Sequence, residues 1–201
     1  MFANALFWFV MAFVFAAIEV ESEGKYGWAE KAPTWYRTTG RVARVYGFFM
    51  NGKPLTGYHC FMFFLPVLIF HTGFVLGAPW SWAAEMRILA LLAAWCSVWD
   101  YLWFIINPAY GIEGFHRENV WWYARSRWLF NRLPVDYLVN WVLSIILAAL
   151  GGLSCLYQHL VTLLYFLFMI MVLICVVSPF RFWRVWMLMR DDRDKADIFH
   201  N

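Results

Sequence analysis

The chain has 201 residues, of which 63% are hydrophobic and only 14% are charged. Soluble domains usually contain about 25% charged residues, so this composition excludes an ordinary water-soluble domain and indicates an integral membrane protein. The formal net charge of +3 is small, and anionic lipid headgroups are sufficient partners for the basic residues. We therefore expect one membrane domain over residues 1–201, with membrane lipids and no nucleic acid as partners.

The first apolar run extends from about Ala3 to Ile18 and predicts the first membrane crossing. This run is short against the ~20 residues that a span needs, so its far end should carry Glu19 and Glu23 near the headgroup level. These glutamates are four residues apart and share one edge of a helix. No basic segment precedes the run, which predicts a retained helix rather than a signal peptide.

The first connection, residues 25–57, is rich in basic side chains. Arg37, Arg41 and Arg44 recur at helical spacing, while apolar residues between them face elsewhere. This pattern is typical of an amphipathic helix that lies in the membrane interface.

Two further crossings are predicted over about Tyr58 to Leu76 and Trp82 to Ile106, joined by an uncharged turn. His59 begins the first of them, and His71 lies roughly 18 Å further along the same helix at 1.5 Å per residue. Asp100 lies about 10 Å inside the end of the second crossing by the same measure. Asp100 is thus the acidic residue least easily assigned to a helix end.

The remaining chain predicts two more crossings, over about Val135 to Cys155 and Leu160 to Val177. The connection before them, residues 108–134, mixes arginines with tryptophans, which is a composition typical of the membrane interface. Residues 190–201 have mixed charge and predict a solvated cytoplasmic tail.

The basic residues predict the orientation. Every Lys and Arg except Arg87 falls in the first connection, the third connection or the C-terminal tail. Cytoplasmic loops carry an excess of Lys and Arg, so this asymmetry places the N-terminus outside and the C-terminus in the cytoplasm. The expected fold class is all-α: a polytopic bundle of five transmembrane helices with interfacial amphipathic helices, in the cytoplasmic (inner) membrane.

Polar side chains on four predicted helices fall at one level of this bundle. They are Glu19, Glu23, His59, Asp100 and Asp136. An ionisable group inside a membrane costs at least ~2.5 kcal/mol on the insertion scale, so such groups normally face a bundle interior or a wet cavity. The alternative is that each one lies at a helix end, where charge costs little. The coincidence predicts a polar cavity open to the cytoplasmic side.

Carboxylates and imidazoles from facing helices commonly hold a transition metal inside a helical bundle. We expect the metal ligands to be Glu19, Glu23, His59, Asp100 and His116, the last from the connection after the third crossing. Asp136 would be a second-shell partner or the acid/base group. No HExxH motif fixes the reaction, so the hypothesis is a metal-dependent enzyme acting on a lipid or other membrane-soluble substrate.

Two other functions stay open. Trp-rich helix faces are also typical of a non-catalytic subunit that contacts other membrane subunits. A small proton-coupled carrier would use Asp100 and His71 in a relay. His71 is in addition the one residue predicted to bind a cofactor, as an axial haem ligand, which is a weaker expectation than a transition metal.

Overall fold

The computed structural model describes residues 1–180 and is mostly helical. The predicted tail over residues 190–201 lies outside this part of the chain. Four helices are long and apolar enough to cross a membrane, which fits the expected class of membrane protein: α1 (Phe2–Glu23), α3 (Gly57–Val75), α4 (Trp82–Ile106) and α7 (Leu153–Phe180). A fifth apolar helix, α6 (Val135–Leu150), has 16 residues, or roughly 24 Å at 1.5 Å per residue.

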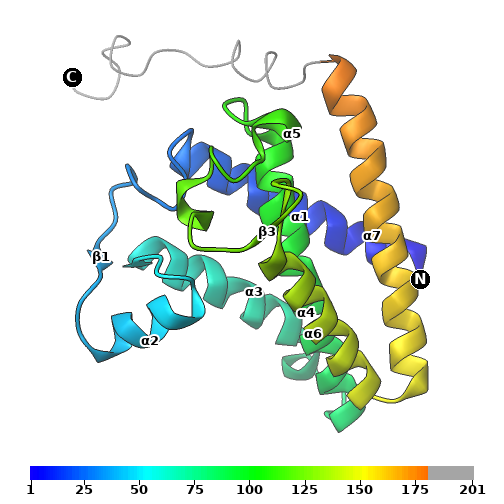
Figure 1. The fold of residues 1–201 in the computed structure, drawn as a ribbon. Helices are drawn as coiled ribbons and strands as arrows, with labels where there is room; N and C mark the ends of the chain where they lie inside the picture. The colour runs from blue at the N-terminus through cyan, green and yellow to red at the C-terminus, as the bar shows by residue number, and fades with distance from the viewer. Residues whose placement is uncertain (181–201) are drawn as a thin grey trace, which may run out of the picture.

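Helix α4 is the centre of the bundle and contacts α1, α3, α6 and α7 (Figure 1). Small residues are buried on both α1 and α4. Ala5, Ala12 and Ala16 of α1 are fully buried, as are Ala90 and Ala94 of α4. Small side chains let two helix backbones approach closely, which is the usual way in which helices pack where lipid removes the hydrophobic driving force.

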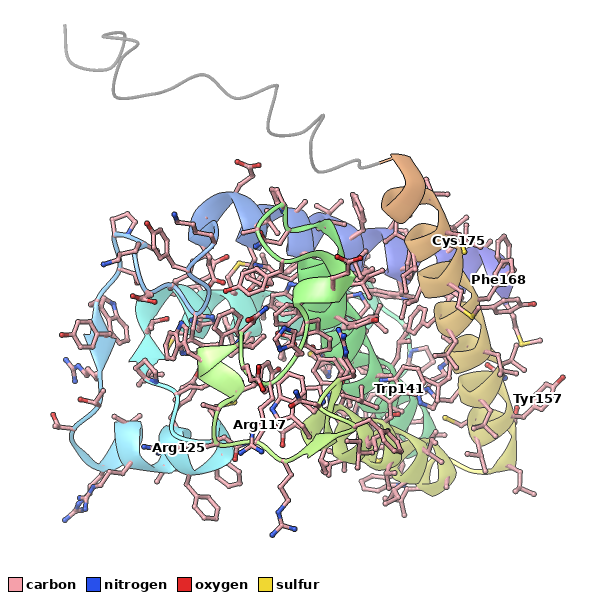
Figure 2. The ribbon with its side chains drawn as sticks, turned by 45° about the horizontal axis from the view of Figure 1, so that its top comes forward. Arg117, Arg125, Trp141, Tyr157, Phe168 and Cys175 are labelled. Atoms are coloured by element: carbon pink, nitrogen blue, oxygen red, sulfur yellow. The ribbon has the colours of Figure 1, made fainter. Side chains whose placement is uncertain are left out.

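The outward faces of the long helices are apolar. Phe64 on α3 and Phe168 on α7 are both more than half exposed. Figure 2 shows Tyr157 and Phe168 along α7, on the other side of the view from Arg117 and Arg125 in the connections. Apolar side chains therefore face outward on the helices, while the exposed cations, apart from Arg87 on α4, lie in the connections.

The helix boundaries differ from the expected ones at three places. Helix α1 continues five residues past Ile18, so Glu19 and Glu23 lie within it. Helix α6 ends at Leu150, because Gly152 has φ +102 and turns the chain. Helix α7 then begins at Leu153, so residues 156–159, expected as a connection, are helical.

Two connections fold over the end of the bundle where α1 ends and α3 begins. The first contains β1 (Tyr36–Arg37), α2 (Arg41–Phe49) and β2 (Leu55–Thr56), and its two strands pair antiparallel. The second contains α5 (Gly111–Gly114), the 3-10 helix η1 (Trp121–Tyr123) and the antiparallel strands β3 (Trp128–Leu129) and β4 (Leu133–Pro134). The expected helix begins at Arg41, because Arg37 belongs to β1. The two connections contact each other, since Trp121 Nε1 donates a hydrogen bond to the Tyr26 carbonyl oxygen.

Candidate functional site

Three side chains from two helix ends form a compact cluster of metal-ligand type. Glu19 and Glu23 lie one turn apart at the end of α1, and His59 lies in the first turn of α3. One ligand atom from each residue lies within 4.8 Å of the other two. All three residues are buried. Burying two carboxyl groups together is costly unless hydrogen bonds or a cation compensate for the lost hydration.

A tight loop after α1 holds one of these carboxyl groups. Gly27, Trp28 and Ala29 are consecutive residues with positive φ, at +68, +46 and +50. This conformation turns the Ala29 backbone N–H toward Glu23, to whose Oε1 it donates a hydrogen bond of 2.5 Å. Left-handed backbone at a non-glycine residue is strained, and such strain is typical of functional sites. No Cβ fits at Gly27, because it would lie 2.3 Å from the Trp122 ring.

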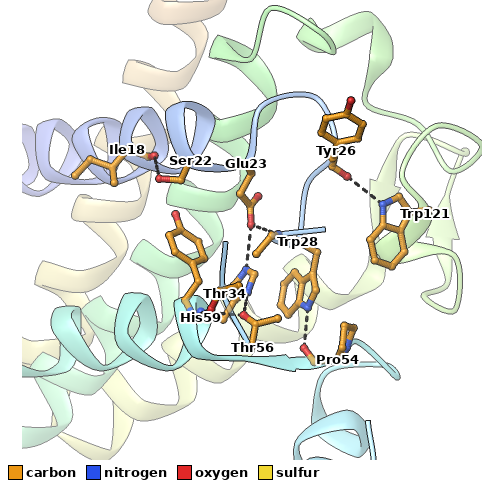
Figure 3. Close-up of polar contacts among 12 residues, drawn as sticks. Ile18, Ser22, Glu23, Tyr26, Trp28, Thr34, Pro54, Thr56, His59 and Trp121 are labelled. Carbon is orange, nitrogen blue, oxygen red and sulfur yellow. Dashed lines mark hydrogen bonds and ion pairs between the residues drawn. The ribbon is translucent and has the colours of Figure 1, made fainter. Parts of the chain in front are cut away.

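The same loop fixes the imidazole. The Trp28 indole stacks on the His59 ring with centroids 4.0 Å apart, and Trp28 Nε1 donates to the Pro54 carbonyl oxygen. Thr56 caps α3 by accepting the His59 backbone N–H, and its Oγ1 lies 2.7 Å from His59 Nδ1. His59 Nε2 therefore faces Glu23, with 3.4 Å to Oε1. Figure 3 shows Glu23, Trp28, Thr56 and His59 converging in this way.

A small cavity of about 50 Å³ lies against the cluster. The cluster residues line it together with Trp28, Asp100 and Trp103. The indole N–H of Trp103 is buried and has no hydrogen-bond partner among residues 1–180. A buried donor of this kind normally finds a partner, and Trp103 is one of the residues that line the cavity. The space suits a metal ion with its water rather than an organic molecule.

Asp100 lies beside the cluster and is held differently. It lines the small cavity, but its carboxylate is not part of the three-residue group. Asp100 Oδ2 accepts hydrogen bonds from the hydroxyls of Tyr123, at 2.9 Å, and Tyr137. Burial, together with the nearby Asp100 charge, raises the pKa of Tyr123 well above its usual value, so Tyr123 remains a donor. Asp100, expected as a metal ligand, is thus a hydrogen-bonded neighbour of the cluster.

A second and larger cavity, of about 480 Å³, lies on the other side of Asp100. Lys53 lines it and is only 7% exposed. Its Nζ lies 3.9 Å from the centre of the Tyr123 ring and 4.5 Å from that of Trp28. Burial lowers the pKa of Lys53, although Asp100 and Asp136 act in the opposite direction. The two aromatic faces supply cation–π attraction to the ammonium group.

Asp136, expected as a second-shell or acid/base residue, lines this larger cavity. Asn51 Nδ2 donates to Asp136 Oδ2 at 2.9 Å, and Ser126 Oγ donates to the same oxygen at 2.5 Å. Asn51 and Gly52 have φ of +51 and +84, so this turn sends the Asn51 side chain to Asp136 and places Lys53 in the cavity. Asp136 therefore connects both folded connections to α6.

The structure does not bring His71 or His116 to the cluster. His71 lies on α3 and contacts Glu85 Oε1 through Nε2, at 3.1 Å, and the Val67 carbonyl oxygen through Nδ1, at 2.7 Å. Both of its ring nitrogens thus have protein partners, whereas an axial haem ligand needs one free. His116 follows α5 in the second connection and is half-buried. Neither histidine belongs to the three-residue group or lines the two cavities described above.

Three residues at the site were missed in the sequence. Lys53 was predicted only to be one of the basic residues of the first connection, although the Asn51-Gly52 dipeptide before it is a turn signal. Trp28 resembled any interfacial tryptophan, and no pattern marks its stacking on His59. Thr56 does carry a signal, because a threonine three residues before His59 at the start of an apolar run is a typical helix N-cap.

No protein-family model matches the chain, and no curated protein or solved structure is significantly similar to it. The geometry of the site is therefore the basis for a functional proposal.

Proposed function

We propose that the protein is a metal-dependent membrane enzyme that acts on a lipid or another membrane-soluble substrate. The observation that carries the proposal is the buried convergence of Glu19, Glu23 and His59, whose ligand atoms lie within 4.8 Å of one another. Two carboxylates and one imidazole suit a divalent transition metal such as manganese, iron or zinc. Three protein ligands also leave coordination positions open, as in catalytic rather than structural sites.

The surroundings of His59 support this role. If its Nδ1–H donates to Thr56 Oγ1, which lies 2.7 Å away, the Nε2 lone pair is free to bind metal beside Glu23. A metal-bound histidine almost always donates its other N–H in this way. A bound divalent ion would polarise a substrate oxygen or lower the pKa of a bound water. Asp100, adjacent to the cluster, would position or exchange a proton with the substrate.

The membrane arrangement proposed with this function has five crossings. Helix α6 is the fifth, the N-terminus lies outside, and the site lies at the cytoplasmic end of a multi-pass protein in the cytoplasmic membrane. In its support, the two connections over the site contain every Lys and Arg of residues 1–180 except Arg87. Labelling of single cysteines introduced at Arg117 and at Gly152 tests it in intact cells. The first should be protected from an impermeant reagent and the second labelled.

Metal analysis tests the catalytic proposal. Protein purified in mild detergent without chelator should contain about one equivalent of transition metal, and Glu23→Gln should lose it. Glu85→Gln is the matched control, because Glu85 pairs with His71 away from the cluster. Folding is checked by gel filtration. Folded wild-type protein that takes up no metal, or a Glu23→Gln variant that retains it, would refute the proposal.

The same preparation distinguishes the alternatives. A non-catalytic subunit would hold no metal and would co-purify with a membrane partner, whose loss would follow changes in the exposed aromatic side chains. A proton-coupled carrier needs His71 and Asp100 in one relay. His71 contacts Glu85 and Val67, and neither of them contacts Asp100, so the geometry favours the enzyme.

A further inference from the structure

The larger cavity adjoins the metal cluster through a shared wall. Trp28, Phe63, Cys96 and Asp100 line both the small cavity of about 50 Å³ and the larger one of about 480 Å³. The first has room for an ion and water. The second has the size of typical ligand pockets, which are about 300–1,000 Å³. A molecule in the larger cavity would therefore lie next to the cluster with only these side chains between them.

The larger cavity also has an apolar side. Phe49, Val139 and Leu143 line it and are 74%, 61% and 46% exposed. Val139 and Leu143 lie one turn apart on α6, a helix whose exposed residues are otherwise apolar, so the cavity continues onto a surface suited to lipid chains. An acyl or alkyl chain can leave along this face while a polar head stays inside.

The polar side contains a cation without a hydrogen-bonding partner. Lys53 is only 7% exposed, and within the described part of the chain no group accepts a hydrogen bond from its Nζ or forms an ion pair with it within 4.0 Å. Only the two aromatic faces hold it. Buried polar groups are normally hydrogen-bonded, so this ammonium group is positioned for an oxygen acceptor on a ligand.

The charges of the cavity select the kind of head. One ammonium, Lys53, lies among two carboxylates, Asp100 and Asp136, so the formal charge of these three groups is −1 when all are ionised. A carboxylate or phosphate head would add further negative charge in a poorly hydrated space, where like charges repel strongly. The Oδ2 atoms of both aspartates already accept two hydrogen bonds each. Their Oδ1 atoms remain as acceptors for a hydroxyl group.

We propose that the larger cavity binds an amphiphile with an uncharged, hydroxyl- or carbonyl-bearing head, in the class of monoacylglycerols and long-chain alcohols. Lys53 donates to the head oxygen, an aspartate accepts from its hydroxyl, and the chain leaves past Val139 and Leu143. The identification of this amphiphile as the substrate depends on the proposed metal function, but its binding does not.

Native mass spectrometry of the full chain in a neutral detergent tests the proposal with monoolein and oleate as probes. Wild-type protein should bind monoolein at least tenfold more tightly than oleate. Lys53→Met, which keeps the apolar stem, and Leu143→Trp, which fills the chain end of the cavity, should each weaken monoolein binding at least tenfold. Lys25→Met and Leu150→Trp, at exposed positions, are the matched controls and should change it less than twofold.

Each outcome decides the proposal. Equal or tighter binding of oleate shows that the head is an anion and overturns it, as does monoolein binding that is unchanged in both cavity variants. If Lys53→Met does not fold, Leu143→Trp alone decides. Metal content measured on the same samples separates the two proposals: monoolein binding without metal refutes only the enzyme, whereas metal without selective monoolein binding refutes only the amphiphile site.

Discussion

Replacing Gly27 with alanine tests whether the strained loop after α1 builds the site. Gly27 has φ +68, and an added Cβ would lie 2.3 Å from the buried Trp122 ring. A left-handed conformation costs a non-glycine residue about 1–2 kcal/mol, and overpacking costs roughly 1–3 kcal/mol more. The sum is about 2–5 kcal/mol of unfolding free energy. Any backbone shift that relieves the clash moves the Ala29 N–H away from Glu23.

Gly111→Ala is the matched control, because Gly111 has φ +60 and no atom lies within 4 Å of its added Cβ. It should carry only the conformational cost. For a domain of this size each kcal/mol lowers Tm by about 2–4 °C. Gly111→Ala should therefore lower Tm by about 2–8 °C and Gly27→Ala by about 4–20 °C. Thermal unfolding in mild detergent, followed by a thiol-reactive dye, measures both.

Metal content separates the role of the loop from general stability. Gly27→Ala protein kept below its own Tm should contain less metal than Gly111→Ala protein under the same conditions. If Tm decreases equally in the two variants, the clash with Trp122 does not restrict the loop. If they bind metal equally, the Ala29 contact with Glu23 does not position the ligand, and the reasoning about strain at this site fails.

Three further predictions concern the same end of the bundle. Thr56→Val removes the N-cap of α3, which should lower the free energy of unfolding by about 1 kcal/mol, and removes the contact with His59, which should lower metal affinity 10–100-fold. Ser81→Ala, which removes the N-cap of α4, should lower only stability. Competition with a chelating dye measures the metal affinity. The lowered pKa of Lys53 means that the folded state binds fewer protons than the unfolded state between that pKa and about 10.4. Stability should rise with pH through this window and level off below the lowered pKa, and Lys53→Met should flatten this slope in Tm as the pH is raised towards about 10.4. Removing metal with EDTA should lower the wild-type Tm, since 100-fold excess over Kd is worth about 2.7 kcal/mol, and should leave that of Glu19→Gln unchanged.

The helices were predictable because apolar length is a strong and local signal. The third predicted crossing, about Trp82 to Ile106, coincides with α4. Helix α1 continues past the predicted crossing to Glu23, because a helix persists as long as its backbone hydrogen bonds are satisfied even where hydropathy falls. The start of α7 was set too late for the same reason, since His159 is polar but buried beside Ser144.

The cluster was only partly predictable. Glu19, Glu23 and His59 were expected together because the lengths of the predicted helices place them at a common depth in the membrane. The sequence did not predict which other candidates would join them, because depth in the membrane does not specify the direction of a side chain around its helix or the path of a connection. Asp100 lies at the right depth and yet pairs with two tyrosines from later segments, and the 26-residue separation between Trp28 and Pro54 has no counterpart in any local pattern.

The acidic residues at this end differ in how their charge is compensated. Asp100 accepts two tyrosine hydroxyls, and Asp136 accepts an amide and a serine hydroxyl. Glu23 instead accepts a backbone N–H and faces a histidine nitrogen, with Glu19 one turn away. The aspartates are thus satisfied by the protein in the larger cavity, whereas the glutamate pair gains most from an added cation. This division supports the proposed metal binding in the small cavity and the proposed recognition of the polar head in the larger one.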